Sequence, residues 1–345
     1  MDQKPFVSVV LPVRNEVAHV KQFMNPLLSQ TYPKDRMEIL VVDGMSQDGT
    51  RRIVEEFIRE NGHVKVRLLD NPRRQRAPAL NLGVQNARGD VVLRIDARTI
   101  IADDYVEKCV RALMATGVDN VGGMQVPITK GNGSPRKELT QQAVGIALSH
   151  PFGIGNAQFR LGRKSGYVDT VYLGCFRRDI FDKVGLFDEE SVVISEDSDM
   201  NYRIRKAGGK VYFDKDIIAY YYPRDTLRDL ARLYFRYGGA KAGNLIRTKN
   251  LTAWRQWVPP LFLGSLIVFG AGSIFSVAAR YAFACILGLY LLADVSVSAR
   301  LALKHRCWRL FHHLMPVFPT LHFSWATGFF VRLIQRPKPG QYWGY

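Results

Sequence analysis

The sequence predicts an α/β fold with a parallel sheet, followed by apolar C-terminal helices that enter a membrane. Three observations predict this architecture. Short β-branched segments recur in the N-terminal third, and polar or acidic residues follow each of them. Three carboxylates, Glu196, Asp197 and Asp199, stand at the start of a helical pattern. Residues 257–279 carry no charged side chain, and this length is sufficient to cross a bilayer.

The first two expected strands are Val7–Val10 and Ile39–Val42. The second ends at Asp43, and a turn-rich segment then leads into an expected helix, Arg51–Glu60. Ligands of open α/β sheets bind outside the carboxyl ends of the strands. Asp43 is therefore placed to contact a ligand, and the alternative role for its side chain is to cap the turn that follows.

The third expected strand is Val91–Ile95, with Asp96 at its end. Asp103 opens a helix whose apolar positions lie on one face: Tyr105, Val106, Cys109, Val110 and Leu113. Together with Asn15 and Glu16 after the first strand, Asp43 and Asp96 bring acidic and polar groups to one sheet edge. Converging acids are unfavourable unless a cation joins them. A metal–diphosphate complex or nearby arginines would supply that charge.

The segment Ile194–Lys210 predicts a helix that begins with acids. Its apolar residues Met200, Ile204 and Ala207 recur at helical spacing, and two glycines then end the pattern. Acids at a helix start cap the backbone and complement its dipole. The same acids are also candidates for a catalytic site.

In this order, the motifs PVRNE, VVDGMSQDGT, IDAR and SEDSDMNYRIRKAGG resemble family 2 inverting glycosyltransferases with the GT-A fold. The resemblance covers Val7 to Gly243. Two further segments, Val168–Glu190 and Leu230–Ala242, are similar to the succinoglycan-type glucosyltransferases of bacterial exopolysaccharide assembly. The resemblance implies a Rossmann-like sheet that binds a nucleotide sugar, and a hexosyltransferase that uses a UDP-sugar.

The resemblance also implies roles for individual residues. On the donor side, the implied contacts are Pro12, Arg14, Glu16, Asp43, Arg76, Asp96 and Arg98. Asp197 would be the general base, and Glu196 would support it. On the side of the acceptor and the diphosphate, the implied contacts are Asp199, Arg232, Arg236 and Tyr237. The segment Asn71–Gly83, which contains Arg76, would close over the nucleotide, and a solvated basic loop is its alternative interpretation.

Inverting transfer has chemical requirements that fit these assignments. One carboxylate must take the acceptor proton on the face opposite the leaving nucleotide. A cation favours departure of the diphosphate because it neutralises the charge that develops there. No second, nucleophilic carboxylate is required, which distinguishes this chemistry from that of a retaining glycosidase.

Two departures from the family pattern affect this interpretation. The usual Asp-x-Asp is Asp96-Ala97-Arg98 here, and arginine cannot ligate a metal. Either Asp96 alone holds Mg²⁺ or Mn²⁺ with additional waters, or Arg98 binds the diphosphate directly; a surface position is the third reading of Arg98. Leu233-x-x-Arg236-Tyr237 replaces the Gln-x-x-Arg-Trp motif of processive enzymes, which favours single-sugar addition. Arg228, Arg232 and Arg236 form a helical stripe for phosphate or lipid headgroups.

Composition restricts the class of partner. The chain has 48 Lys and Arg against 31 Asp and Glu, a net charge of +17. This balance suits anionic lipids or phosphorylated substrates. Nucleic acid is not an expected partner, because no nucleic-acid-binding module is recognisable. The four cysteines show no paired spacing, which favours a reducing compartment without a disulfide framework or zinc site.

The C-terminal third predicts several membrane segments. Arg280 separates the charge-free run 257–279 from a second apolar run, 281–299, which predicts a hairpin of two transmembrane helices. A basic loop, Arg300–Arg309, would follow on the cytoplasmic side. Pro316 and Pro319 interrupt the start of a third run, Leu314–Val331, which is interpreted as a re-entrant or interfacial segment or a third span. Gly131–Ser165 is interpreted as an acceptor-side flap or an ordinary long connection.

These observations lead to one organisation and one function. Residues 1–223 form a cytoplasmic GT-A catalytic domain, 224–256 amphipathic interface helices, and 257–345 a multi-pass domain in the plasma membrane. No signal-peptide pattern precedes the first strand. The predicted reaction transfers a sugar from a UDP-sugar to a lipid-linked saccharide on a polyprenyl diphosphate, and membrane lipids are further partners. The alternatives are a polyprenyl-phosphate sugar synthase and a non-catalytic, sugar-nucleotide-binding assembly subunit.

Overall fold

The computed structural model of the chain describes residues 4–131, 133–189, 195–249 and 253–335. Residue contacts divide the chain into two compact units, and each is described by itself. The first comprises residues 1–126 and 158–221, and the second comprises residues 127–157 and 222–345. Residues 127–157 therefore interrupt the first unit in sequence.

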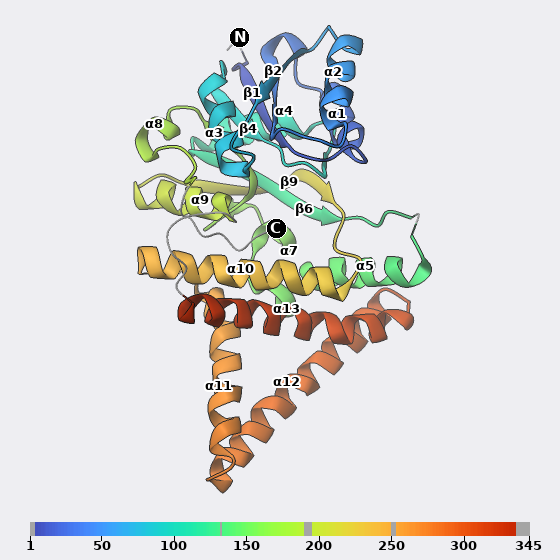
Figure 1. Cartoon of the computed structure of the whole chain (residues 1–345), viewed down its shortest axis with the longest axis vertical. Coiled ribbons are helices and arrows are strands. Elements are labelled where there is room, and N and C mark those ends of the chain that lie inside the picture. The colour runs from blue at the N-terminus through green and yellow to red at the C-terminus, as the bar shows by residue number, and fades with distance from the viewer. Residues whose placement is uncertain (1–3, 132, 190–194, 250–252, 336–345) are drawn as a thin grey trace. The chain divides into compact units, whose positions relative to one another are not determined.

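Among the described residues, the first unit contains a nine-stranded sheet (Figure 1). Its order is β3-β2-β1-β4-β8-β6-β9-β5, and β7 pairs with β9. Strands β1 to β4 pair in parallel, whereas β8 is antiparallel to both β4 and β6. The strands are β1 (Val7–Val13), β2 (Met37–Asp43), β3 (Lys65–Asp70), β4 (Val91–Arg94), β5 (Thr99–Ile101), β6 (Asn120–Pro127), β7 (Gly166–Tyr167), β8 (Tyr172–Arg177) and β9 (Val211–Tyr221).

The three predicted strands are confirmed as β1, β2 and β4, with small changes at their ends. β1 continues through Pro12, which lies opposite Val42 of β2. The helices of this unit are α1 (Val20–Leu28), η1 (Lys34–Arg36), α2 (Thr50–Glu60), α3 (Arg76–Asn86), α4 (Tyr105–Thr116), α7 (Gln158–Leu161), α8 (Ile180–Val184) and α9 (Glu196–Lys206).

Alternating strand residues build two cores, one on each face of the sheet. Val9 and Leu11 of β1 pack into a core with side chains from α1, α2 and α4. Val10 of the same strand belongs to a second core, which contains residues from α3, α8 and α9. The sheet is therefore covered on both faces, as expected for a largely parallel α/β sheet. The predicted helix after Asp103 is confirmed, and its apolar positions are buried in the first core.

The second unit is helical and centres on α13. Its helices are α5 (Pro135–Leu148), α6 (Pro151–Ile154), α10 (Leu227–Thr248), η2 (Trp254–Gln256), α11 (Val258–Gly272), α12 (Val277–Lys304) and α13 (Arg309–Ile334). Thr226 starts α10, because its hydroxyl accepts from the Asp229 amide at 3.1 Å. Helices α10 and α13 lie side by side (Figure 1). A Cβ on Gly328 would lie 1.9 Å from the Phe235 carbonyl oxygen, so glycine is required at this crossing.

The structure corrects several expectations for this unit. The segment expected to be a flap or a connection, Gly131–Ser165, contains α5 and α6 of this unit and α7 of the first unit. Buried residues of α5 share a core with α13. The predicted break at Pro316 and Pro319 is wrong, because α13 runs through both prolines. Burial of neighbouring α13 side chains such as Phe318 offsets the cost of about 3 kcal/mol expected for proline inside a helix.

The predicted hairpin of two transmembrane helices is also revised. The turn between α11 and α12 lies at residues 273–276, and Arg280 belongs to the first turn of α12. Arg300 and Lys304 lie in α12 rather than in a loop. Among the described residues, α12 is the one helix long and apolar enough to cross a membrane. The 15 residues of α11 span about 22 Å, which is shorter than the roughly 30 Å of a hydrocarbon core.

Candidate active site

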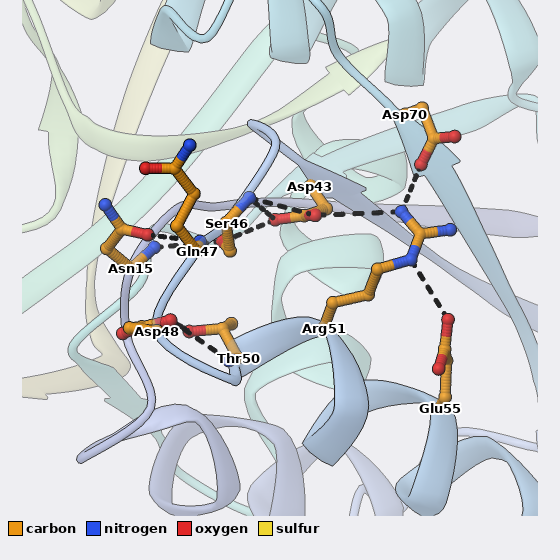
Figure 2. A network of polar contacts seen from close by, with 9 residues as sticks. All are labelled: Asn15, Asp43, Ser46, Gln47, Asp48, Thr50, Arg51, Glu55 and Asp70. Atoms are coloured by element: carbon orange, nitrogen blue, oxygen red, sulfur yellow. Dashed lines mark hydrogen bonds and ion pairs between the residues drawn. The ribbon is translucent and has the colours of Figure 1, made fainter.

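The turn after β2 holds Asp43 in a local hydrogen-bond network (Figure 2). The Asp43 side chain is 1% exposed, and its two carboxylate oxygens accept from the Ser46 amide at 3.2 Å. The Ser46 hydroxyl donates to the same carboxylate at 2.5 Å, and Nη1 of Arg51 lies 3.7 Å away. Asp43 therefore caps the turn that follows its strand. Its implied contact with the nucleotide-sugar donor stays a prediction.

The loop after β1 is bound to this turn. Asn15 has a φ of 51°, and its amide donates to the Ser46 hydroxyl at 3.0 Å. Its side-chain oxygen accepts from the Gln47 amide at 2.9 Å (Figure 2). The Glu16 amide donates to Oγ1 of Thr50 at 2.7 Å. These bonds fix the carboxyl ends of β1 and β2 as one surface, as the strand-end argument predicted.

The basic segment before α3 is anchored to the same surface. The Asn71 amide donates to the Asp43 carbonyl at 2.8 Å, and its side chain donates to the Gln75 carbonyl at 2.8 Å. Nη1 of Arg14 donates to the Arg74 carbonyl at 3.2 Å. The exposed guanidinium of Arg14 thus lies beside the segment that was predicted to close over a nucleotide.

Arg98 lies in the turn between β4 and β5 rather than at the start of a helix. Its φ is 67°, and the Thr99 amide donates to the Asp96 carbonyl at 3.2 Å to close the turn. Nε of Arg98 donates to the two carboxylate oxygens of Glu16 at 3.0 and 2.8 Å. The Arg98 side chain is 52% exposed. The structure therefore brings together two predicted donor residues, Glu16 and Arg98, from two strand ends.

A buried arginine that the motif analysis did not select, Arg94, organises the acids near the end of β4. The Arg94 side chain is 4% exposed, and its Nε and Nη2 donate to the two Asp96 oxygens at 2.6 and 2.9 Å. Nη2 also donates to Oε1 of Glu196 at 2.6 Å. Arg76 of α3 also contacts both acids, with Nη1 at 3.3 Å from Glu196 and 3.9 Å from Asp96. These four residues are referred to as the Arg94 cluster.

The members of the Arg94 cluster stabilise one another's charged forms. Burial alone would lower the pKa of Arg94, but Asp96 and Glu196 outweigh it and hold that pKa well above its usual value. Burial would likewise raise the pKa of Asp96, yet the charges of Arg94 and Arg76 hold it below its usual value. Burial would also raise the pKa of Glu196, but the charges of Arg94 and Arg76 hold it below its usual value. At neutral pH, the cluster therefore contains two cations and two carboxylates.

The three acids at the start of α9 have different surroundings. Glu196 is buried in the Arg94 cluster, and Asp199 is buried with one carboxylate oxygen 2.9 Å from Nε of Arg203. Asp197 lies between them and is partly exposed, and its carboxylate accepts from the Ser198 amide at 2.7 Å. The predicted base is thus the most accessible of the three acids. The predicted acceptor contact of Asp199 stays a prediction.

The sequence contains a signal that Arg94 is a buried, paired residue. The segment Val91–Ile95 is an aliphatic strand interrupted by a single arginine, two residues before Asp96. A buried arginine requires a carboxylate partner. The spacing of two residues along a strand places both side chains on the same face, but it does not identify Glu196 as the second partner.

The other predicted acceptor residues lie on α10 of the second unit. Arg228 and Arg232 are exposed, and Arg236 is half-buried on the same helix. Nη1 of Arg232 lies 3.7 Å from Asp229, and the ring of Tyr237 meets that of Tyr234 edge-on at 5.5 Å. The three arginines, four residues apart, therefore lie on one helix, as their spacing predicted. The role of this stripe toward phosphate or lipid headgroups stays a prediction.

The donor groups near Asp96 do not form a metal site built by the protein. Among the described residues, no group of three or more His, Cys, Asp or Glu side chains could hold a metal ion. Both Asp96 oxygens already accept hydrogen bonds from Arg94, and Arg98 offers no electron pair. A cation at Asp96 would meet one carboxylate that a guanidinium has already neutralised.

Comparisons with known proteins give a consistent result. A sequence profile described as "Glycosyl transferase family 2" matches residues 8–185. The chain is 29% identical over 340 residues to the "Succinoglycan biosynthesis protein ExoA" of Rhizobium meliloti, covering 94% of both chains. It is 23% identical over 336 residues to the "Dolichyl N-acetyl-alpha-D-glucosaminyl phosphate 3-beta-D-2,3-diacetamido-2,3-dideoxy-beta-D-glucuronosyltransferase" of Methanococcus voltae, covering 96% of this chain and 98% of that one.

One solved structure shows that the fold is shared. The mannosyltransferase PcManGT from Pyrobaculum calidifontis, solved in complex with GDP-Man and Mn²⁺, is similar with a TM-score of 0.55 at 19% identity. The similarity covers 93% of this chain and 88% of the mannosyltransferase. It confirms the predicted α/β sheet of the GT-A type followed by C-terminal helices.

Proposed function

Because this chain belongs to glycosyl transferase family 2, we propose that it is a membrane-anchored inverting hexosyltransferase. The proposed donor is a UDP-sugar, and the proposed acceptor is a saccharide linked to a polyprenyl diphosphate. The product would be a lipid-linked saccharide extended by one sugar, for surface or exopolysaccharide assembly.

The observation that carries this proposal is the accessibility of Asp197 at the start of α9. Arg94 and Arg76 neutralise Glu196, and Arg203 neutralises Asp199. Asp197 is the one of these acids with a partly exposed side chain. A general base must reach a substrate proton, so an acid buried in an ion pair is a poorer candidate. Asp197 is therefore the proposed base.

The proposed reaction is one in-line displacement at the anomeric carbon. An acceptor hydroxyl oxygen forms the new bond to that carbon while Asp197 takes the hydroxyl proton. The bond between the anomeric carbon and the UDP oxygen breaks, and UDP leaves with the bonding electron pair. The configuration at the anomeric carbon inverts, so an α-linked donor gives a β-linkage. Glu196 supports the base through its position next to Asp197 in the first turn of α9.

The proposed donor surface lies along the ends of β1, β2 and β4. Pro12, Arg14 and Glu16 would line the nucleotide pocket, with Asp43 at the base or ribose. Arg76 and Arg98, whose side chains are 54% and 52% exposed, would contact the diphosphate. Because the donor set at Asp96 does not fit a protein-built metal site, the proposed mechanism contains no metal step.

The proposed lipid-linked acceptor is supported by two full-length relatives. One is named for succinoglycan biosynthesis, and the other for transfer to a dolichyl-linked sugar phosphate. Arg232, Arg236 and Tyr237 of α10 are the proposed contacts for such an acceptor or its diphosphate. Arginine binds phosphate oxygens in a bidentate manner, which fits the stripe of exposed and half-buried arginines on α10.

The apolar surfaces of α11 and α12 support membrane attachment. Val268 of α11 is 66% exposed, and Tyr281 and Leu292 of α12 are 73% and 63% exposed. In water these surfaces would be unfavourable, whereas lipid would cover them. We propose that α12 anchors the protein in the plasma membrane with the catalytic unit in the cytoplasm. α11, and α13 as an interfacial segment, would extend this attachment toward the predicted multi-pass arrangement.

The decisive experiment is a donor screen with detergent-purified protein and polyprenyl-diphosphate saccharides as acceptors. UDP-sugars and GDP-sugars are tested in parallel, with nucleotide release and glycolipid extension as readouts. The expected result is extension of one acceptor by one sugar from one UDP-sugar, and its loss in Asp197→Asn. Transfer to polyprenyl phosphate alone would support the synthase alternative instead. Nucleotide binding without turnover on any acceptor would support a non-catalytic assembly subunit.

A further inference from the structure

We infer that Arg94 is the resident cation of this site, so that sugar transfer requires no divalent metal ion at Asp96. This inference rests on the proposed glycosyltransferase function and concerns how the site balances charge. Arg94 lies in strand β4 and is not one of the residues that the family resemblance selected.

The contacts of Arg94 occupy the position that a metal ion would need. Two of its nitrogens bind the two oxygens of Asp96 at 2.6 and 2.9 Å, which is a bidentate arrangement. The same guanidinium bridges to Glu196 at 2.6 Å. A divalent ion ligated by both Asp96 oxygens would have to displace a buried charged group, because the Arg94 side chain is only 4% exposed.

The charge of the Arg94 cluster also disfavours a divalent ion. Arg94 and Arg76 carry two positive charges, and Asp96 and Glu196 carry two negative ones, so the cluster is already neutral. A metal ion would add two positive charges beside a buried guanidinium, where the low dielectric strengthens repulsion.

The remaining hydrogen-bond donor of Arg94 also favours an anionic ligand over a metal ion. Nη1 of Arg94 is buried and has no hydrogen-bond partner among the described residues. A buried donor without a partner is unfavourable by about 1–3 kcal/mol, and more for a charged group. An anionic oxygen of a bound donor would satisfy such a group, whereas a metal cation would not.

Two half-exposed arginines, Arg98 and Arg76, lie close to the acids of this site. Arg98 stands at the position of the second acid of the usual motif, and Arg76 reaches over the cluster from α3. Both guanidinium groups are about half exposed, and phosphate oxygens are ligands that arginine binds bidentately. The positive charge that the leaving diphosphate requires is thus carried by side chains of the protein itself.

The first test uses the unmodified protein in two measurements. Binding of Mn²⁺ to the whole chain is titrated without nucleotide and followed by electron paramagnetic resonance. UDP release is measured separately, with and without EDTA. We expect no Mn²⁺ binding up to millimolar concentrations, and a rate that EDTA changes by less than twofold. Turnover abolished by EDTA and restored by Mn²⁺, or tight Mn²⁺ binding without nucleotide, would overturn the inference.

The Mn²⁺ titration requires no turnover, so it separates the two proposals. An enzyme that turns over only with Mn²⁺ would contradict the resident-cation inference and leave the proposed function standing. A protein that excludes Mn²⁺ yet transfers no sugar from any donor would contradict the proposed function alone.

A variant series tests whether Arg94 itself excludes the ion. Arg94→Met removes the guanidinium, and we expect it to bind Mn²⁺ at least tenfold more tightly than the unmodified protein. Arg94→Lys keeps the charge and should continue to exclude Mn²⁺. Arg67→Met is the matched control, because it removes an arginine that pairs at 3.4 Å with another buried acid, Glu38. Unchanged Mn²⁺ affinity in folded Arg94→Met would contradict the inference, and the measurements on unmodified protein decide it if that variant does not fold.

Discussion

Two aspartates near the ends of parallel strands β2 and β4, which lie on either side of β1, are stabilised in different ways. Asp43 accepts hydrogen bonds from Ser46, three residues further along the chain, and the result is a capped turn. Asp96 is neutralised by Arg94, which also binds Glu196 from a helix 102 residues away. The first arrangement is local and prepares a binding surface. The second joins distant segments and sets the charge beside the proposed base, so changes at the two places should have different effects.

The largest expected effect concerns the base beside the Arg94 cluster. Asp197→Asn removes the proton acceptor, and we expect kcat to fall by about 10²–10⁴-fold. UDP affinity, measured by calorimetry, should remain within about twofold, because the proposed donor surface is built from the ends of strands and not from α9. A variant with normal kcat would show that another group takes the acceptor proton.

The next effect is on stability. Arg94→Met leaves the buried Glu196 and its partly buried neighbour Asp96 without their main cation, and breaking a buried ion pair such as Arg94–Glu196 costs about 3–5 kcal/mol. Thermal unfolding in detergent should show a large decrease in Tm. Arg67→Met should have a smaller effect, because Glu38 retains hydrogen bonds from the Ser8 hydroxyl and the Arg88 amide at 2.7 and 2.8 Å. Equal decreases in Tm would contradict the distinct role assigned to Arg94.

A smaller effect is expected at the Asp43 turn, and it should fall on donor binding. Asp43→Asn weakens the hydrogen bonds to Ser46, and charged hydrogen bonds of this kind contribute about 1.5–3 kcal/mol. We expect KM for the donor to rise by about tenfold while kcat changes little. Asp70→Asn is the control, because that residue pairs with the same Arg51 but its side chain is 55% exposed. If Asp43→Asn lowered kcat and left KM unchanged, Asp43 would not act through donor binding, and the proposed difference from Asp96 would be wrong.

The smallest effect is expected for Arg51 at the edge of the same turn. Its side chain is 41% exposed and pairs with Glu55 and Asp70 (Figure 2). Exposed ion pairs contribute about 0–1 kcal/mol, so Arg51→Ala should lower the free energy of unfolding by no more than that. Comparison of chemical unfolding midpoints with the unmodified protein measures it. A change of several kcal/mol would mean that Arg51 supports the buried Asp43 more strongly than its 3.7 Å separation indicates.

Several features of the fold and site could be predicted because they depend on nearby residues. Strand periodicity identified β1, β2 and β4, and the spacing of Met200 and Ile204 identified α9. The turn after Asp43 has the acceptor and the serine three residues apart, so its cap is also a local property. The accessible and the buried acids of α9 could not be distinguished in this way, because burial depends on what packs against each of them.

What the sequence by itself determined was therefore local: the strands, the helix starts, the acidic motifs and the apolar C-terminal runs. What only the tertiary structure decided was which distant groups meet. The pairing of Arg94 with Glu196, of Arg98 with Glu16, and the passage of α13 through two prolines depend on contacts between segments far apart in the chain. The physical reason is that hydrophobic packing and charge pairing act on neighbours in space, whereas sequence periodicity records only neighbours along the chain.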